Sequence, residues 1–130
     1  MREKIADWNE LKEELKVRFA EAVKVRNRGD LNSARQLFLK LAEEDTQSTA
    51  IYAVLGDICW DMGVLDEAVL AFSHAVKFSP KLEAVSLGLF HALWELDKRV
   101  EALEEIKRFQ AVADSEDYRE IIREINEKSK

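Results

Sequence analysis

Residues Thr49 to Leu82, TAIYAVLGDICWDMGVLDEAVLAFSHAVKFSPKL, contain two amphipathic helical patterns separated by Gly63. Apolar residues recur every three or four positions in each pattern, which is typical of a helix with one buried face. Pro80 ends the second pattern because proline cannot continue a helix. The stretch therefore predicts a helical hairpin. The residues on the two apolar faces are Tyr52, Leu55, Gly56 and Cys59 in the first helix, and Leu65, Ala68, Val69, Phe72, Ala75 and Val76 in the second.

The same pattern recurs on both sides of this hairpin at a shift of 34 residues. Such a repeated helix–turn–helix unit resembles the tetratricopeptide repeat (TPR). The resemblance implies an all-α fold, an α-solenoid of three TPR-like helical hairpins. The matching positions are Gly29, Ala34 and Phe38 before the hairpin, for Gly63, Ala68 and Phe72, and Ala102, Ile106 and Phe109 after it, for Ala68, Phe72 and Ala75.

We expect one domain over residues 1–130, with repeats at about 15–48, 49–82 and 83–116. A helix uninterrupted from Glu3 to Arg28 is predicted, and residues 3–14 of it form an N-terminal extension. A C-terminal capping helix is predicted over residues 115–128, which makes about seven helices. Its N-cap is Ser115, and its apolar stripe consists of Tyr118, Ile121, Ile122 and Ile125.

Turn and glycine positions add three local expectations. Gly29 and Gly63 are predicted to end helices in a left-handed conformation, whereas Asp97 replaces the glycine at the third such turn. Gly56 lies within a helix, and we expect it where a partner helix approaches closely near Ala68. Gly88 is also within a helix, and we interpret it as the floor of a groove or as room for a contact within the groove.

Composition limits the function. The net charge is −6, with 20 basic and 26 acidic residues, which argues against a nucleic-acid backbone as partner. The N-terminal residues lack the apolar core of a signal peptide, and no apolar run approaches the roughly 20 residues needed to span a bilayer. We therefore expect a soluble cytoplasmic protein without membrane or nucleic-acid partners.

No catalytic or metal-binding arrangement is evident. Cys59 lies on a core face, so we interpret it as a buried inert thiol. His74 and His91 lack the spacing of zinc ligands. Asp57 and Asp61 are one helical turn apart, which favours a solvated helix face. We predict no cofactor and no metal, and no enzymatic activity.

The TPR resemblance also implies a binding face. In that family the exposed sides of the first helices line a concave groove that holds a peptide or a helix of a partner. Several of the corresponding positions here are apolar, which is typical of a contact surface. The groove residues that we predict to bind a partner are Phe19, Val23, Arg26, Asp57, Trp60, Asp61, Leu87, His91, Trp94 and Glu95.

Some TPR proteins use a carboxylate clamp for acidic C-terminal tails. The clamp positions correspond here to side chains that cannot bind a carboxylate, so this use is not predicted. Three repeats with an apolar groove are similar in architecture to the small chaperones of type III secretion translocators. The clamp positions are Phe19, Val23, Val54, Ala84 and Gly88.

These observations predict a non-catalytic protein-binding module, an adaptor, chaperone or inhibitor of one partner. One alternative is a homodimer in which the first helix or the groove covers a second copy. The other is an enzyme or ligand-binding domain built around Asp57, His91 and Glu95. Trp60 and Trp94 are 34 residues apart, and we expect both at the groove edge, as binding anchors or as seals between repeats.

Overall fold

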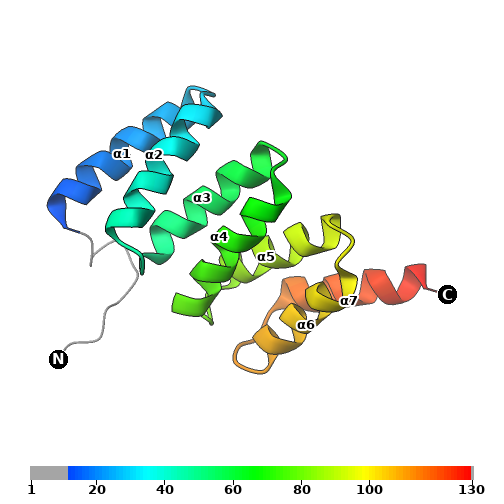
Figure 1. Cartoon of the computed structure of the whole chain (residues 1–130). Coiled ribbons are helices and arrows are strands. Elements are labelled where there is room, and N and C mark those ends of the chain that lie inside the picture. Colours follow the sequence, from blue (N-terminus) through cyan, green and yellow to red (C-terminus); the bar gives the residue numbers. More distant parts are fainter. Residues whose placement is uncertain (1–11, 130) are drawn as a thin grey trace.

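The computed structural model describes residues 12–129, and this part of the chain forms seven α-helices without a β-strand (Figure 1). Three helical hairpins follow one another along the stack, and the second helices of the first two hairpins also pack on the first helix of the next hairpin. The expected all-α solenoid is confirmed. The helices are α1 (Glu13–Asn27), α2 (Leu31–Glu44), α3 (Thr49–Asp61), α4 (Leu65–Phe78), α5 (Glu83–Glu95), α6 (Arg99–Gln110) and α7 (Glu116–Lys128).

The helix ends follow from short-range hydrogen bonds. Asp30 caps α2 by accepting a hydrogen bond from the Ser33 backbone N–H at 3.2 Å. Ser115 caps α7 in the same way, through the Tyr118 N–H at 3.0 Å, as predicted. These caps satisfy backbone donors that have no partner within the helix.

The three turns inside the hairpins share one backbone conformation. Gly29 and Gly63 have φ values of +90° and +74°, as expected for residues that end helices in the left-handed region. Asp97 has φ 61° at the corresponding place. Aspartate tolerates this region better than most residues because its short side chain can hydrogen-bond locally. The third turn therefore departs from the repeat in residue type and keeps its geometry.

Small residues set the distances between helices. Ala34, Ala68 and Ala102 are fully buried, as the repeat pattern requires. A Cβ atom on Gly56 would lie 2.8 Å from the Phe72 ring of α4, so the close approach predicted there is made by Phe72.

Gly88 makes a second close approach to Phe72. A Cβ atom on Gly88 would lie 2.6 Å from the same Phe72 ring. One edge of this ring therefore fits into a notch formed by Gly56 of α3 and Gly88 of α5. The notch brings the two first helices together, with Gly56 buried and Gly88 half-buried.

The expected uninterrupted helix from Glu3 to Arg28 is wrong at one point. The helix α1 begins at Glu13, and Lys12 before it has an extended backbone with ψ 150°. The remainder of the predicted extension, residues 3–11, lies outside the described residues.

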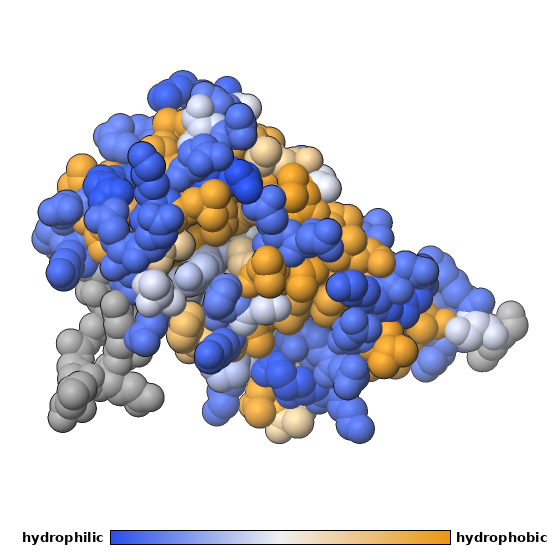
Figure 2. Space-filling model, viewed as in Figure 1, coloured by the Kyte–Doolittle hydropathy of each residue, from blue (hydrophilic) through white to orange (hydrophobic). Residues whose placement is uncertain are grey.

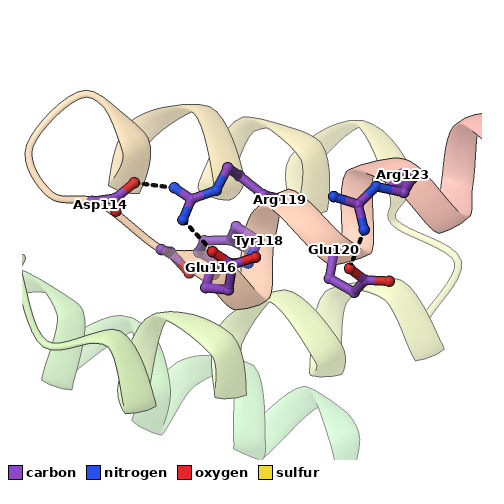
Figure 3. Close-up of polar contacts among 7 residues, drawn as sticks. Asp114, Glu116, Tyr118, Arg119, Glu120 and Arg123 are labelled. Atoms are coloured by element: carbon purple, nitrogen blue, oxygen red, sulfur yellow. Dashed lines mark hydrogen bonds and ion pairs between the residues drawn. The ribbon is translucent and has the colours of Figure 1, made fainter.

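The two ends of the described stack differ from each other. Ile51, at the start of α3, is 0% exposed because α2 packs over it, whereas its counterpart Val17 on α1 is 62% exposed. At the other end, α7 turns charged residues outward: Arg119 pairs with Asp114 and Glu116, and Arg123 pairs with Glu120 (Figure 3). A charged surface such as that of α7 keeps a repeat stack from growing at that end.

The surface in the view of Figure 1 is divided by polarity. Figure 2 shows apolar side chains along the middle of the molecule and mostly hydrophilic ones over the end that α7 forms. Among the described residues, no helix has both the length and the apolar character that crossing a bilayer requires.

Candidate functional site

The first helices of the hairpins, α1, α3 and α5, carry the residues that the sequence predicts to bind a partner. We call the surface that they form the inner face. Neighbouring first helices meet along it, α1 with α3 through Arg26 and Asp61, and α3 with α5 through Trp60 and His91. The stacking of the hairpins therefore brings together side chains from different repeats.

The joint between α1 and α3 is an ionic one. The Arg26 guanidinium lies 3.5 Å from the Asp61 carboxylate, and both side chains are partly open to solvent. Asp57 lies one turn before Asp61. Partial removal from water raises the pKa of Asp57, and the charge of Asp61 adds to this effect, while Arg26 opposes it. This joint therefore holds two carboxylates and one cation.

The joint between α3 and α5 is aromatic. Trp60 occupies on α3 the position that Arg26 has on α1, 34 residues earlier. Its ring centroid lies 6.4 Å from that of His91, in an edge-to-face arrangement. Trp60 is nevertheless 37% exposed, and His91 is exposed too. The indole thus closes the joint with one side and offers the rest of its surface to solvent.

Trp94 does not repeat the environment of Trp60, although the two share a repeat position. Its ring stacks on Phe90, with centroids 5.6 Å apart, and the Arg99 guanidinium lies 4.2 Å from its centroid. Trp94 is only partly exposed. Trp60 on α3 faces α5, whereas Trp94 on α5 faces the capping helix α7. The side chains Ile121 and Ile125 of α7 are only partly buried, so α7 does not close over Trp94 as α5 does over Trp60.

A hollow of about 640 Å³ lies between α7 and the α5–α6 hairpin. The hollow adjoins the inner face, because His91 and Trp94 of α5 line the hollow and also belong to the inner face. Its apolar lining includes Phe90, Trp94, Leu103, Ile121 and Ile125, and its charged lining consists of Arg99, Glu124 and Lys128.

The apolar residues among the other predicted site residues pack against the core. Phe19 makes an edge-to-face contact with the fully buried Phe38, with centroids 5.2 Å apart. Val23 and Leu87 are partly buried and pack on the core. Glu95 is exposed near the end of α5. These apolar side chains mainly support the inner face, and the exposed aromatic and charged groups make up its surface.

A buried polar network holds α7, and sequence reasoning missed it. Ser86 of α5 donates a hydrogen bond to Glu105 of α6 at 2.6 Å and contacts the Tyr118 hydroxyl at 2.7 Å. Because a serine hydroxyl has one proton, Tyr118 is the donor to Ser86. Arg108 binds both carboxylate oxygens of Glu105, at 2.8 and 2.6 Å, and also donates to the Pro80 carbonyl.

This network is a consequence of tertiary packing. Glu105 is only 7% exposed, so its charge is balanced by the bidentate Arg108 contact. Burial raises the pKa of Tyr118 above its ordinary value, which keeps the hydroxyl as a donor. The network anchors the first turn of α7, and the last two turns of the helix border the hollow.

The residues of the enzyme alternative do not all line this hollow. His91 lines the hollow, whereas Asp57 and Glu95 are absent from its lining. Of these three side chains, Asp57 has a raised pKa, and it faces the Arg26 joint. Within the described part of the chain, no group of three or more His, Cys, Asp or Glu side chains could hold a metal ion.

Comparison with known proteins places the fold. Neither a family model nor a curated protein sequence matches the chain. Among solved structures, the Yersinia enterocolitica type III secretion chaperone SycD in complex with a peptide of the translocator YopD has a TM-score of 0.73 at 18% identity, covering 90% of each chain. A point mutant of MamA has a TM-score of 0.69 at 20% identity, covering 80% of this chain and 76% of that one. Another structure of SycD, described as an alternative dimer, has a TM-score of 0.70 at 17% identity, covering 90% of this chain and 89% of that one.

These similarities define the class of the fold. MamA and SycD are TPR-like proteins, so the chain has a TPR-like helical-repeat fold. At identities of 20% or less, the similarity extends to the fold alone.

Proposed function

We propose that this protein is a non-catalytic binding module that holds a segment of a partner protein on its inner face. The observation that carries the proposal is the half-exposed Trp60 at the joint of α3 and α5, flanked by His91. Tryptophan is the residue type most enriched at binding hot spots, because a large rigid ring loses much apolar surface to water when it is covered.

The charges beside Trp60 suit a polar partner group. Asp57 and Asp61 share the single cation of Arg26, so this joint has an excess of negative charge. A lysine or arginine of the partner would balance it and could also stack on the indole. The bound segment would therefore place an apolar side chain near Trp60 and a basic one toward α1.

The structural relatives are consistent with this role. SycD is described as a translocator chaperone and was solved with a peptide of YopD. Because function does not follow from fold alone, this similarity supports the class of activity and leaves the partner open. A chaperone or an adaptor of one partner are the forms that we favour.

The test uses short random peptides displayed on phage and selected on the immobilised full chain. Binding of a selected peptide is then titrated by fluorescence polarisation. We expect Trp60→Ala to weaken binding roughly tenfold or more, since truncating a hot-spot residue costs about 2 kcal/mol. Its urea-unfolding curve should stay close to that of the wild type, because Trp60 is partly exposed.

Leu70→Ala is the matched control, since Leu70 is an exposed apolar residue of α4. It should bind the selected peptides as the wild type does. Failure to select any peptide, or equal affinity of the Trp60→Ala variant, would contradict the proposal.

A homodimer is the second candidate, supported by the description of one SycD structure as a dimer. Its inner face would then be covered by another copy of the chain. Sedimentation velocity over a range of protein concentrations distinguishes the two cases. A protein that sediments as a monomer at all concentrations would contradict the homodimer.

A further inference from the structure

The hollow between α7 and the α5–α6 hairpin lies where the α3–α5 joint has an aromatic contact. At the α3–α5 joint, His91 lies across from Trp60. On α7, Glu124 has the position that corresponds to His91, because the N-cap Ser115 follows the N-cap Leu82 by 33 residues. Glu124 and Trp94 both line the hollow instead of closing the joint.

The opening has a cause in the packing of α7. Tyr118 is fully buried at the first turn, where the Ser86–Glu105 network holds it. Beyond this turn, Ile121 and Ile125 remain partly exposed, and Leu103 on the opposite wall is 43% exposed. Apolar side chains on both walls therefore face a space that the described chain does not fill.

The electrostatic character of the hollow differs from that of the rest of the protein. The chain carries a net charge of −6, whereas the lining has two cations, Arg99 and Lys128, and one carboxylate, Glu124. Arg99 pairs with Asp97 at the surface, and Lys128 has no ion-pair partner among residues 12–129. An occupant with a carboxylate close to a large apolar side chain would match this lining.

We propose that the hollow is the anchor site of the bound partner segment and takes a large apolar side chain, with an adjacent aspartate or glutamate directed at Arg99 and Lys128. This inference rests on the proposed function and adds the chemistry of the partner. The hollow adjoins the inner face through His91 and Trp94, so one segment can occupy both. Its volume of about 640 Å³ lies within the roughly 300–1,000 Å³ of sites that enclose small ligands.

The direction of the segment follows from the two charge patterns. The α1–α3 joint holds two carboxylates and one cation, and the lining of the hollow holds two cations, of which Arg99 is paired with Asp97, and one carboxylate. The segment would therefore carry its basic residue toward α1 and its acidic residue toward α7. Such opposite ends fix the register of an elongated ligand.

The experiment uses peptides selected by phage display on the full chain. Expected sequences pair a large apolar residue with a neighbouring aspartate or glutamate. Leu103→Glu should weaken their binding roughly tenfold or more, as for a buried hot-spot contact, and Lys128→Glu about two- to fivefold, as for an exposed ion pair. Both side chains are exposed enough for the substitutions to leave the fold intact, which urea unfolding checks.

Matched controls separate this site from the rest of the surface. Leu70→Glu places the same charge on an exposed apolar position of α4, and Lys107→Glu reverses an exposed charge on α6 outside the hollow. Neither should change the affinity of the selected peptides by more than about twofold.

Three results would overturn the inference. If Trp60→Ala abolishes binding while Leu103→Glu and Lys128→Glu leave it unchanged, the hollow is unused and the proposed function stands. If no peptide is selected, the proposed function and the inference both fail. If the wild-type chain sediments as a dimer and Leu103→Glu makes it monomeric, a second copy of the chain fills the hollow.

Discussion

The contact between Phe72 and two glycines permits a sharp test of the packing. A Cβ atom on Gly88 would lie 2.6 Å from the Phe72 ring, and one on Gly56 would lie 2.8 Å from it. Real Cβ atoms essentially never come this close to another heavy atom. In Gly88→Ala the ring must therefore move within a core where Phe72 is only 3% exposed.

The magnitude follows from two opposing effects. Overpacking a core by one methyl group costs about 1–3 kcal/mol. Replacing glycine by alanine inside a helix gains about 1 kcal/mol from helix propensity. Gly88→Ala should therefore destabilise the protein by up to about 2 kcal/mol, because the steric cost exceeds or equals the gain.

The decisive comparison is the same substitution in a Phe72→Leu background. Leucine lacks the ring atoms Cε1 and Cζ, which are the two that come closest to Gly88. There Gly88→Ala should stabilise the protein by about 0.5–1 kcal/mol, as in an unobstructed helix. The sign of the effect should thus reverse between the two backgrounds.

The assay is urea unfolding followed by circular dichroism for the wild type, the two single variants and the double variant. Their free energies form a double-mutant cycle, with an expected coupling of about 1–3 kcal/mol. If Gly88→Ala stabilises the wild-type protein as much as it stabilises the Phe72→Leu variant, the notch does not restrict the spacing of α3 and α5.

Three further predictions concern other parts of the structure. Ala68→Leu should lower the free energy of unfolding by about 1–3 kcal/mol, because Ala68 is fully buried where α4 crosses α3; a thermal melt identical to that of the wild type would contradict this helix pairing. Tyr118→Phe should cost only about 0.5–1.5 kcal/mol, because Ser86 keeps its bond to Glu105, whereas Ser86→Ala should cost about 1–3 kcal/mol by leaving the tyrosine hydroxyl without its acceptor; the reverse order in urea unfolding would refute the network. Asp57 has a raised pKa in the folded protein, so stability is lost as the pH rises from the pKa of the unfolded carboxyl through that of the folded one. Asp57→Asn should therefore melt at a higher temperature than the wild type at neutral pH, and the difference should vanish below about pH 4, where the unfolded carboxyl is protonated as well; a difference that persists in acid would have another origin.

Much of the fold could be predicted because its causes are local. Gly29, Gly63 and Ser115 end or begin helices through their own backbone preferences and hydrogen bonds, which act within a few residues. The 34-residue recurrence of alanine and phenylalanine also identifies the buried faces, since a helix places every third or fourth residue on one side. Asp97 shows the limit of this reasoning, because its residue type does not indicate the left-handed backbone that its turn adopts.

The candidate site was only partly predictable. Its exposed members, among them Trp60, Asp61 and His91, lie on the inner face that the repeat pattern indicated. The pattern could not distinguish Trp60 from Trp94, because both have the same position within a repeat. What distinguishes them is the neighbouring first helix, which packs closely at α5 and leaves a hollow at α7.

By itself, the sequence determined the helices, their pairing into hairpins and the residues of their buried faces, since side-chain periodicity and end capping depend on residues close together in the chain. The tertiary structure alone decided how neighbouring hairpins meet. Only in the tertiary structure does Gly88 contact the Phe72 ring, does Glu105 become buried beside Arg108, and does a hollow lie between α7 and the α5–α6 hairpin. These features depend on the distances and angles between helices, which result from packing all the faces at once and are not encoded at any single position.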